Sequence, residues 1–419
     1  MHTPMTRAAR LLVALLCAAL PPAAAAQDGL VVNGHHFSAA LRFGADLGPA
    51  PSDWSLPLAG GGRYSVDDHL VRDRRSGLTI TVPAEALVLA IDPVRPRVFI
   101  RFDNNVTGTI AEFDLTTASS RPLITVAGAQ ARWADRVRYA YSADRLFVDV
   151  TDGTEGGPGV EAPHPIRVFD GTTGRQVGAF TVTTTTANAS YFTNPWIVTP
   201  DGTRAYFGAI SSGFFGAGFV KVVQTADGTT SRFDLRATRL HWDDVNRRLF
   251  VYDGALLHLL SADLAPLGSA PLDIVHDLQI SPHTGRLYVA SGQFHRTYGG
   301  DIHLAVFDSG AFAPLGAANL GNARGFSMTL VSAPGAPRTF SATATGHDVT
   351  LDWTNVGAAS HFVLDVGVAP GRTDASVFLG ASTHVIFAHV PSGTYYLRLR
   401  GGNEFGGGRP SQEVQVVVP

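Results

Sequence analysis

Arg97-Val98-Phe99-Ile100 is the first clear copy of a short phrase that decides the fold of this 419-residue chain. Four further copies follow it: Arg145-Leu146-Phe147-Val148, Arg204-Ala205-Tyr206-Phe207, Arg248-Leu249-Phe250-Val251 and Arg286-Leu287-Tyr288-Val289. Each copy mixes aromatic and aliphatic residues in the manner of a buried β-strand. The aromatic position recurs after 48, 59, 44 and 38 residues. Such a period indicates a repeat architecture.

The residues around each copy indicate a unit of four antiparallel strands. An apolar strand and a tight turn precede the phrase, as in Ala86–Ile91 followed by Asp92-Pro93. A third strand ending in Phe-Asp follows it, as in Phe113-Asp114, and then a fourth strand such as 176–182. Four strands in a repeat of about 40–50 residues are the signature of a propeller blade. The chain is therefore predicted to be all-β.

This pattern resembles the bacterial β-propellers of the YVTN type, which are distant relatives of WD-repeat propellers. Leu287-Tyr288-Val289-Ala290 is the copy closest to the family phrase. Candidate inner strands are centred near Leu56, Leu89, Tyr139, Ile197, Trp242, Gln279 and Met328. The last of them lacks following strands of its own, so we expect segments 30–32 and 37–43 to complete its blade from the N-terminus. We predict a propeller of seven blades over residues 27–332, with six blades as the alternative.

A second domain is predicted after a short linker at residues 333–337, which reads Ala-Pro-Gly-Ala-Pro. Residues 338–419 alternate between apolar and polar positions, as expected of strands with one buried face. The segment resembles an immunoglobulin-like fibronectin type III β-sandwich, with Trp353 in its second strand and 391–399 as the corner into its sixth. The resemblance implies that Tyr395 is the inward-facing corner tyrosine and that Tyr396 points outward.

Residues 1–26 have the pattern of a signal peptide. Arg7 and Arg10 precede the apolar run 11–20, and prolines and alanines follow it. The run is too short to span a membrane, and no later segment is long enough. We therefore expect a secreted, periplasmic or extracellular protein without a membrane span. Cys17, the only cysteine, would leave with the peptide, which excludes disulfides and thiol chemistry from the mature chain.

The charge balance argues against a nucleic-acid partner. The chain has 32 basic and 35 acidic residues and a formal net charge of −3, whereas phosphate recognition requires clustered excess Lys and Arg. The 15 histidines show no H-x-x-x-H or H-E-x-x-H spacing. We expect neither a metal site nor a cofactor.

Long connections between the second and third strands of the blades are the best functional signal. In a propeller they emerge on one face, the long-loop face, together with the segments that lead into the inner strands. Loops longer than strand closure requires are commonly functional. The candidate binding residues in these loops are Phe214, Phe215, Phe294, His295, Arg296 and Tyr298. Polar residues near the starts of inner strands join them: Asp135, Arg136, Asn194, Arg239, His276, Asp277 and Arg324.

Two functions remain open. Aromatic side chains beside charged ones suit a glycan or a protein surface, so one prediction is a secreted, non-catalytic binding or scaffold protein with an extracellular glycan or protein as its partner. An alternative for the aromatics is that they fold back and cover blade edges. Separately, the alternative function is a secreted carbohydrate-active enzyme, a lyase or glycosidase, with its site at the channel mouth. Asp135 and Asp277 would then form a glycosidase carboxylate pair, or His276 would act as the base of a lyase. No motif requires catalysis, so the sequence favours binding.

Overall fold

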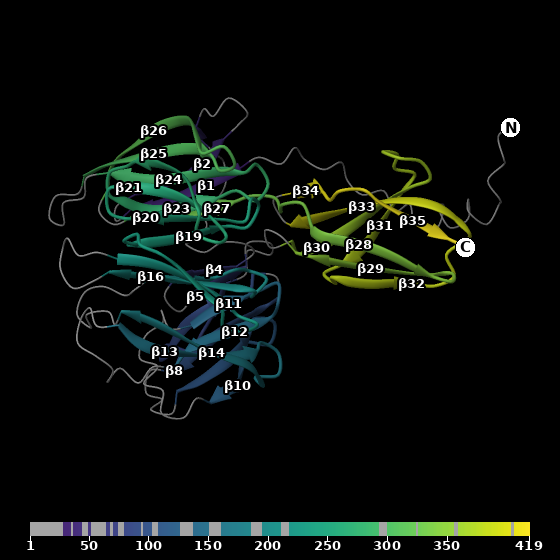
Figure 1. Ribbon diagram of the computed structural model, residues 1–419, viewed down its shortest axis with the longest axis horizontal. Coiled ribbons are helices and arrows are strands. Elements are labelled where there is room, and N and C mark those ends of the chain that lie inside the picture. The colour runs from purple at the N-terminus through teal and green to yellow at the C-terminus, as the bar shows by residue number, and fades with distance from the viewer. Residues whose placement is uncertain are drawn as a thin grey trace. The chain divides into compact units, whose positions relative to one another are not determined.

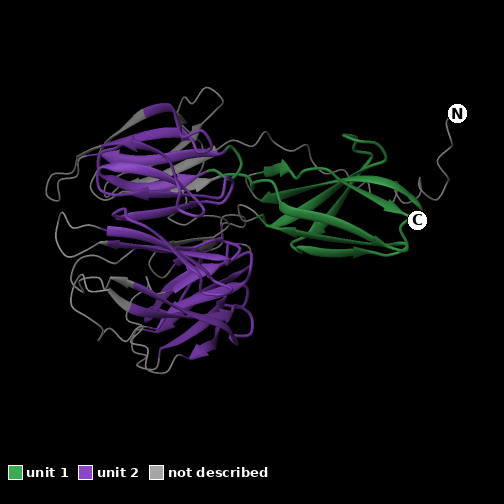
Figure 2. Cartoon of the chain, viewed as in Figure 1, with its two compact units in different colours: residues 1–28, 281–284, 331–419 green, residues 29–280, 285–330 purple. Residues whose placement is uncertain are grey.

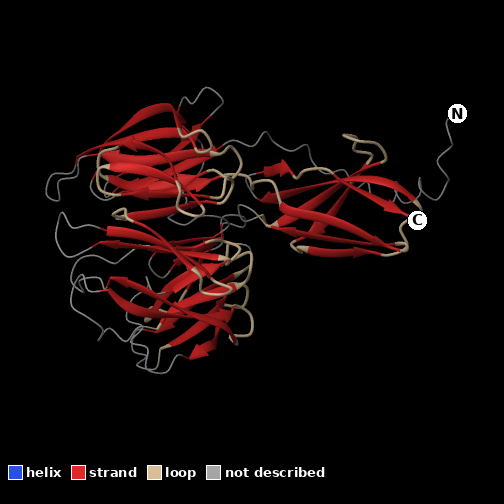
Figure 3. Cartoon of the chain, in the orientation of Figure 1, coloured by secondary structure: helices blue, strands red, loops and turns tan. Residues whose placement is uncertain are grey.

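The computed structural model consists of strands joined by turns and loops. It describes residues 28–34, 37–43, 49–51, 64–67, 70–73, 79–93, 95–102, 108–125, 137–150, 161–185, 195–210, 218–292, 300–323, 326–355, 359–403 and 406–419. Within these ranges there is no helix (Figure 3), and hence none long and apolar enough to cross a membrane.

The chain forms two compact units (Figure 2). One unit comprises residues 29–280 and 285–330, and the other contains residues 331–419 together with the short segment 281–284. The first unit is the propeller, and the second contains the C-terminal sandwich. The fold class predicted from the sequence is confirmed.

The described part of the propeller contains seven sheets (Figure 1). Blade 1 consists of β27 (Phe326–Val331), β1 (Asp28–Gly34), β2 (Phe37–Phe43) and β3 (Pro49–Pro51), and blade 2 of β4 (Tyr64–Asp67), β5 (Leu70–Asp73) and β6 (Thr79–Thr81). The pairing of β27 with β1 closes the ring with strands from both ends of the propeller, as predicted. The inner strand expected near Leu56 lies outside the described residues.

The remaining five blades each have four antiparallel strands in sequence order. Blade 3 is β7 (Ala86–Ile91), β8 (Arg97–Phe102), β9 (Thr109–Asp114) and β10 (Ser119–Thr125), and blade 4 is β11 (Val137–Ala140), β12 (Arg145–Asp149), β13 (Glu161–Asp170) and β14 (Gln176–Thr185). Blade 5 is β15 (Trp196–Val198), β16 (Arg204–Ile210), β17 (Gly218–Gln224) and β18 (Thr230–Phe233). Blade 6 is β19 (Arg239–Asp243), β20 (Arg248–Tyr252), β21 (Leu256–Ser261) and β22 (Pro266–Pro271), and blade 7 is β23 (Val275–Ile280), β24 (Arg286–Gly292), β25 (Gly300–Asp308) and β26 (Ala313–Ala323).

The repeated phrase forms the second strand of blades 3 to 7 and is buried on both of its faces. Its aromatic residue is at most 1% exposed in every copy: Phe99, Phe147, Tyr206, Phe250 and Tyr288. In blade 4, Phe147 packs against Trp196 and Phe207 of blade 5, whereas Leu146 and Val148 pack with Phe99 of blade 3. Blade 6 repeats this arrangement, because Phe250 joins the core with blade 7 and its aliphatic neighbours join the core with blade 5. The alternation of side chains along one strand thus contributes to two inter-blade cores.

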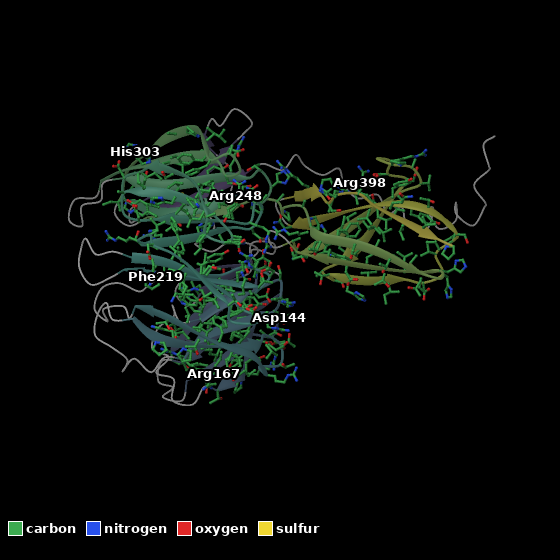
Figure 4. All side chains as sticks on the ribbon, in the orientation of Figure 1. Asp144, Arg167, Phe219, Arg248, His303 and Arg398 are labelled. Carbon is green, nitrogen blue, oxygen red and sulfur yellow. The ribbon has the colours of Figure 1, made fainter. Side chains whose placement is uncertain are left out.

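In three of the five copies, the arginine that opens the phrase connects neighbouring blades. It lies two residues before the aromatic, on the same face of the strand, and there reaches the following blade. Arg145 instead pairs with Asp170 of its own blade (2.7 Å). Arg97 donates to the carbonyl oxygen of Gly171 in blade 4 (2.8 Å), and Arg204 to that of Ala262 in blade 6 (2.6 Å). Arg248 donates to the carbonyl oxygen of Gly310 in blade 7. All three acceptors lie in turns between third and fourth strands; Figure 4 labels Arg248.

The contact between blades 3 and 4 adds a buried ionic network. The Arg97 Nε donates to Asp92 Oδ2 (3.0 Å), and another nitrogen of the same guanidinium donates to Asp144, which Figure 4 labels. The Tyr139 hydroxyl donates to the same Asp92 oxygen (2.7 Å). Burial, together with the negative charge of Asp92, raises the pKa of Tyr139 well above its usual range, so the phenol stays protonated as a donor. The Asp92 carboxylate is fully buried, and these donors offset its loss of water.

The C-terminal unit contains an immunoglobulin-like fibronectin type III sandwich. One sheet has the order β28 (Arg338–Thr345), β29 (Asp348–Thr354), β32 (His384–Phe387). The other has the order β31 (Ala375–Gly380), β30 (His361–Gly367), β33 (Gly393–Asn403), β34 (Gly406–Pro410), and β35 (Val414–Val418) also pairs with β33. Trp353 lies in β29 and is 5% exposed, with its ring edge-on to Phe362 at 5.3 Å. The Tyr395 hydroxyl donates to the carbonyl oxygen of Pro391 (2.9 Å), and its ring packs on the core between the sheets, as the resemblance implies.

The segment predicted as a linker packs on this sandwich. Ser332, residues 333–335 and Pro337 are buried. A methyl group added at Gly408 would lie 2.5 Å from the Pro334 carbonyl oxygen, so only glycine permits this approach. The Asn403 side chain also donates to the carbonyl oxygen of Ser332 (2.9 Å). The compact unit that holds the sandwich accordingly begins at Val331.

Replacing Arg97 with alanine should lower the free energy of unfolding by about 3–5 kcal/mol, because the substitution removes the buried cation beside Asp92 and leaves that carboxylate only the half-exposed Arg95. Urea unfolding of the full chain measures the change. Arg121→Ala is the matched control, because Arg121 is 54% exposed and pairs with Glu112 in contact with solvent. That control should cost at most about 1 kcal/mol. Equal effects of the two substitutions would show that the buried network does not stabilise the joint between blades 3 and 4.

Replacing Trp353 with alanine should cost the sandwich about 3–5 kcal/mol through the cavity it leaves. Hydrogen exchange followed by mass spectrometry localises the loss: peptides from 338–418 should lose protection, and those from 145–292 should keep it. Phe378→Ala, at an aromatic residue that is 60% exposed, should have a much smaller effect. Unchanged exchange in the sandwich of the Trp353 variant would contradict the packing described above.

Candidate functional site

Three of the predicted site residues lie within the described part of the chain. Arg239 is the first residue of β19, and His276 and Asp277 lie near the start of β23 in the next blade. The structure brings these three together where blades 6 and 7 begin. The other predicted residues lie outside the described ranges: Phe214, Phe215, Phe294, His295, Arg296, Tyr298, Asp135, Arg136, Asn194 and Arg324.

Arg239 connects the inner strands of two blades and remains exposed. Its Nε donates to the carbonyl oxygen of Val275 in β23 (2.8 Å). Arg138 in β11 makes the same kind of contact, from its Nε to the carbonyl oxygen of Trp196 in β15 (2.8 Å). In both cases an inner-strand arginine uses one nitrogen to hold the next inner strand. The rest of the Arg239 guanidinium is left facing solvent.

Asp277 connects blade 7 to blade 1. Its Oδ2 accepts the backbone N–H of Met328 in β27 (2.7 Å), and its Oδ1 accepts that of Leu278 (2.8 Å). Burial raises the pKa of Asp277, although both hydrogen bonds and the charge of Arg239 oppose the rise. A raised pKa suits a proton donor, but both oxygens of this carboxylate are already bonded to the backbone. Its described role is to hold the closing strand, and Asp135, its expected catalytic partner, lies outside the described residues.

His241 is a titratable group of this region that was not among the predicted site residues. It lies opposite Phe250 across the strand pair β19–β20, just as Arg138 lies opposite Phe147 and Gln279 lies opposite Tyr288. Gln279 uses this position to donate to the carbonyl oxygen of Met328 (3.3 Å). Burial lowers the pKa of His241, whereas the nearby carboxylates of Asp277 and Asp243 oppose the change. This position falls nine residues before the aromatic residue of the phrase in every blade from 3 to 7. That spacing would have identified His241 from the sequence.

His276 lies near the start of β23, beside the backbone of β24. Its Nε2 lies 3.3 Å from the carbonyl oxygen of Gly292 in β24. Burial lowers its pKa, and the positive charge of Arg239 lowers it further. A lowered pKa favours the neutral imidazole, which is able to accept a proton. Among the described residues, no group of three His, Cys, Asp or Glu side chains is arranged to hold a metal ion.

Comparisons with known proteins identify similar shapes but no relative. No family profile matches the chain, and no curated protein matches it. TolB from Acinetobacter baumannii aligns with a TM-score of 0.39 and 11% identity over 73% of this chain and 66% of TolB, so the chain spans just under two thirds of TolB. A chain of the nidogen/laminin complex aligns with a TM-score of 0.37 and 10% identity over 72% of this chain and 98% of its own length. The FN5 domain of Drosophila Lar aligns with a TM-score of 0.18 and 15% identity over 20% of this chain and 97% of the domain.

His241 should make the propeller less stable in mild acid. Its pKa in the folded chain lies below the ordinary 6.5, so the folded state favours the neutral ring. The stability this contributes is fully present above pH 6.5 and is lost as the pH falls toward the folded pKa. His241→Gln, which installs the residue found at the matching position of blade 7, should reduce the loss in free energy of unfolding between pH 7.5 and pH 5. Urea unfolding at the two pH values measures it.

The raised pKa of Asp277 acts with the opposite sign, because stability linked to that carboxyl is gained as the pH falls. Asp277 is present in both the parent and the His241→Gln chains, so the difference between them reports the histidine together with its interaction with Asp277. If the two chains lose stability equally on acidification, His241 is not the group responsible.

Proposed function

We propose that this chain is a secreted β-propeller of the YVTN type that binds an extracellular glycan or protein through its long-loop face. The pattern of residues 1–26 supports export. The fibronectin type III domain would act as a spacer or a second docking module. The proposal is for binding without catalysis.

The main support is the difference between the two sets of connections in the propeller. On the side opposite the long loops, the turns use their polar side chains internally. Asp201 accepts from Thr199, Thr203 and Arg247, and these hydrogen bonds outweigh burial and lower its pKa to about 2. Asp243 accepts two backbone N–H groups and the Asn246 side chain. Few such groups are left for a ligand.

The segments that lead into inner strands keep side chains available instead. Arg239 and Asp273 are exposed, and Ile274 is 51% exposed. Charged and aliphatic groups close together are typical of protein interaction surfaces. Binding residues are commonly carried by loops on a rigid scaffold, and the paired blades supply such a scaffold.

Alanine substitution of Phe294 and Tyr298 should weaken ligand binding by about 2 kcal/mol or more, roughly thirtyfold, as for aromatic anchors. A glycan array and a screen of extracellular proteins identify the ligand, and titration measures its affinity. Urea unfolding should change by about 0.5 kcal/mol or less. Arg175→Ala and Thr229→Ala, at exposed turn residues on the opposite side, are the controls. Binding that is lost in the controls and kept in the loop variants would place the ligand on the wrong face for this proposal.

A further inference from the structure

Arg236 is a half-buried arginine beside the predicted site, and one nitrogen of its guanidinium has no hydrogen-bond partner. It lies in segment 234–238, which leads into β19, and its side chain is half-buried. The Nε atom is buried and has no hydrogen-bond partner. No described residue forms an ion pair with this arginine. A buried donor left in this state is costly, and no described residue satisfies it.

Close packing against two glycines holds this arginine in place. A methyl group added at Gly218 would lie 2.6 Å from the Arg236 Cα, so the backbones of blade 5 and this segment are in contact. A methyl group at Gly254 would lie 3.7 Å from Arg236 Nη1. The guanidinium therefore lies beside the short turn between β20 and β21, where Gly254 and Ala255 are exposed.

Arg239, three residues further along, also lacks an acidic partner. One of its nitrogens donates to the Val275 carbonyl oxygen, and no described carboxylate lies within ion-pair distance. Two of the three acidic groups nearby, Asp253 and Asp277, have other partners. Asp253 accepts the N–H groups of Ala255 and Leu256 and lies 2.9 Å from the His258 ring. Asp277 accepts two backbone N–H groups, and Asp273 is exposed.

The surroundings of the two arginines favour a protein ligand over a sugar. Ile274 is 51% exposed and precedes Val275, whose carbonyl oxygen receives Arg239. An exposed aliphatic side chain suits an apolar residue of a peptide. Sugar rings are usually held by aromatic faces, and no aromatic side chain in the described segments 234–239, 253–256 and 272–277 is exposed.

We propose that Arg236 and Arg239 bind carboxylates of an extended acidic protein segment, with a neighbouring aliphatic side chain of that segment on Ile274. This inference rests on the proposed function and names the class of partner for the same face. Arginine suits the role because its planar fork donates two parallel hydrogen bonds to one carboxylate.

The test uses the full mature chain and two labelled synthetic peptides, an eight-residue Glu-Val repeat and the matching Gln-Val repeat. Fluorescence anisotropy should detect binding of the Glu-Val peptide alone, weakening as salt is raised. Arg236→Gln and Arg239→Gln should each reduce its affinity about tenfold or more, which corresponds to about 1.4 kcal/mol. Arg236→Lys should recover only part of the loss, because lysine keeps the charge and lacks the fork. Ile274→Ser should also weaken binding.

Arg175→Gln is the matched control, because it removes the same charge from an exposed arginine on the opposite side of the propeller and should leave affinity unchanged. Unfolding midpoints of all variants establish that each is folded. Equal binding of both peptides, or unchanged binding in the Arg236→Gln/Arg239→Gln chain, would overturn the inference. Binding of polygalacturonate in place of the Glu-Val peptide would also overturn it and would identify an acidic glycan.

The outcomes separate this inference from the proposed function. If the double arginine variant binds the ligand found by screening normally while the Phe294 and Tyr298 variants do not, only the acidic-segment inference fails. If neither set of substitutions affects binding, the proposal that the long-loop face binds the ligand fails as well.

Discussion

Burial of the second strand on both faces is the constraint on which the propeller depends. An aromatic ring fills the core shared with the following blade, and the aliphatic residues on either side of it fill the core shared with the preceding one. Among the described residues of blades 3 to 7, no blade has a complete core of its own. Each sheet is stable because its two neighbours cover it, as is typical of repeat proteins whose units bury apolar surface only by stacking.

Polar contacts also connect neighbouring blades, but they do so differently at the two ends of the propeller. Where second strands begin, arginines and aspartates cross from one blade to the next and leave few groups for a partner. Where inner strands begin, Arg239 and Asp277 also cross between blades, but each does so through the neighbouring backbone. The backbone acceptor leaves the charge of Arg239 without a counterion. The Arg239 side chain is thus able both to hold the neighbouring strand and to offer its charge to a ligand.

The sequence predicted the parts of the fold that repeat and failed where tertiary contacts decide the role of a residue. The spacing of the phrase predicted the blades, and alternation around Trp353 predicted the sandwich. The contacts of Arg97 were not predictable, because its partners lie in another blade, 47 and 74 positions away. Asp277 was predicted as a site residue from its place at a strand start, and the structure shows it bonded to Met328. Arg236 follows no repeated pattern, so only its missing partner reveals it.

The first blade has a consequence for how the chain is made. Its three outer strands, β1 to β3, are synthesised first, whereas its inner strand, β27, is completed only after the rest of the propeller. Until then β1 has one unpaired edge, a surface prone to pairing with other chains. The pairing of β27 with β1 therefore forms late and joins two strands that are far apart in the sequence. Contacts of this kind are expected to slow folding.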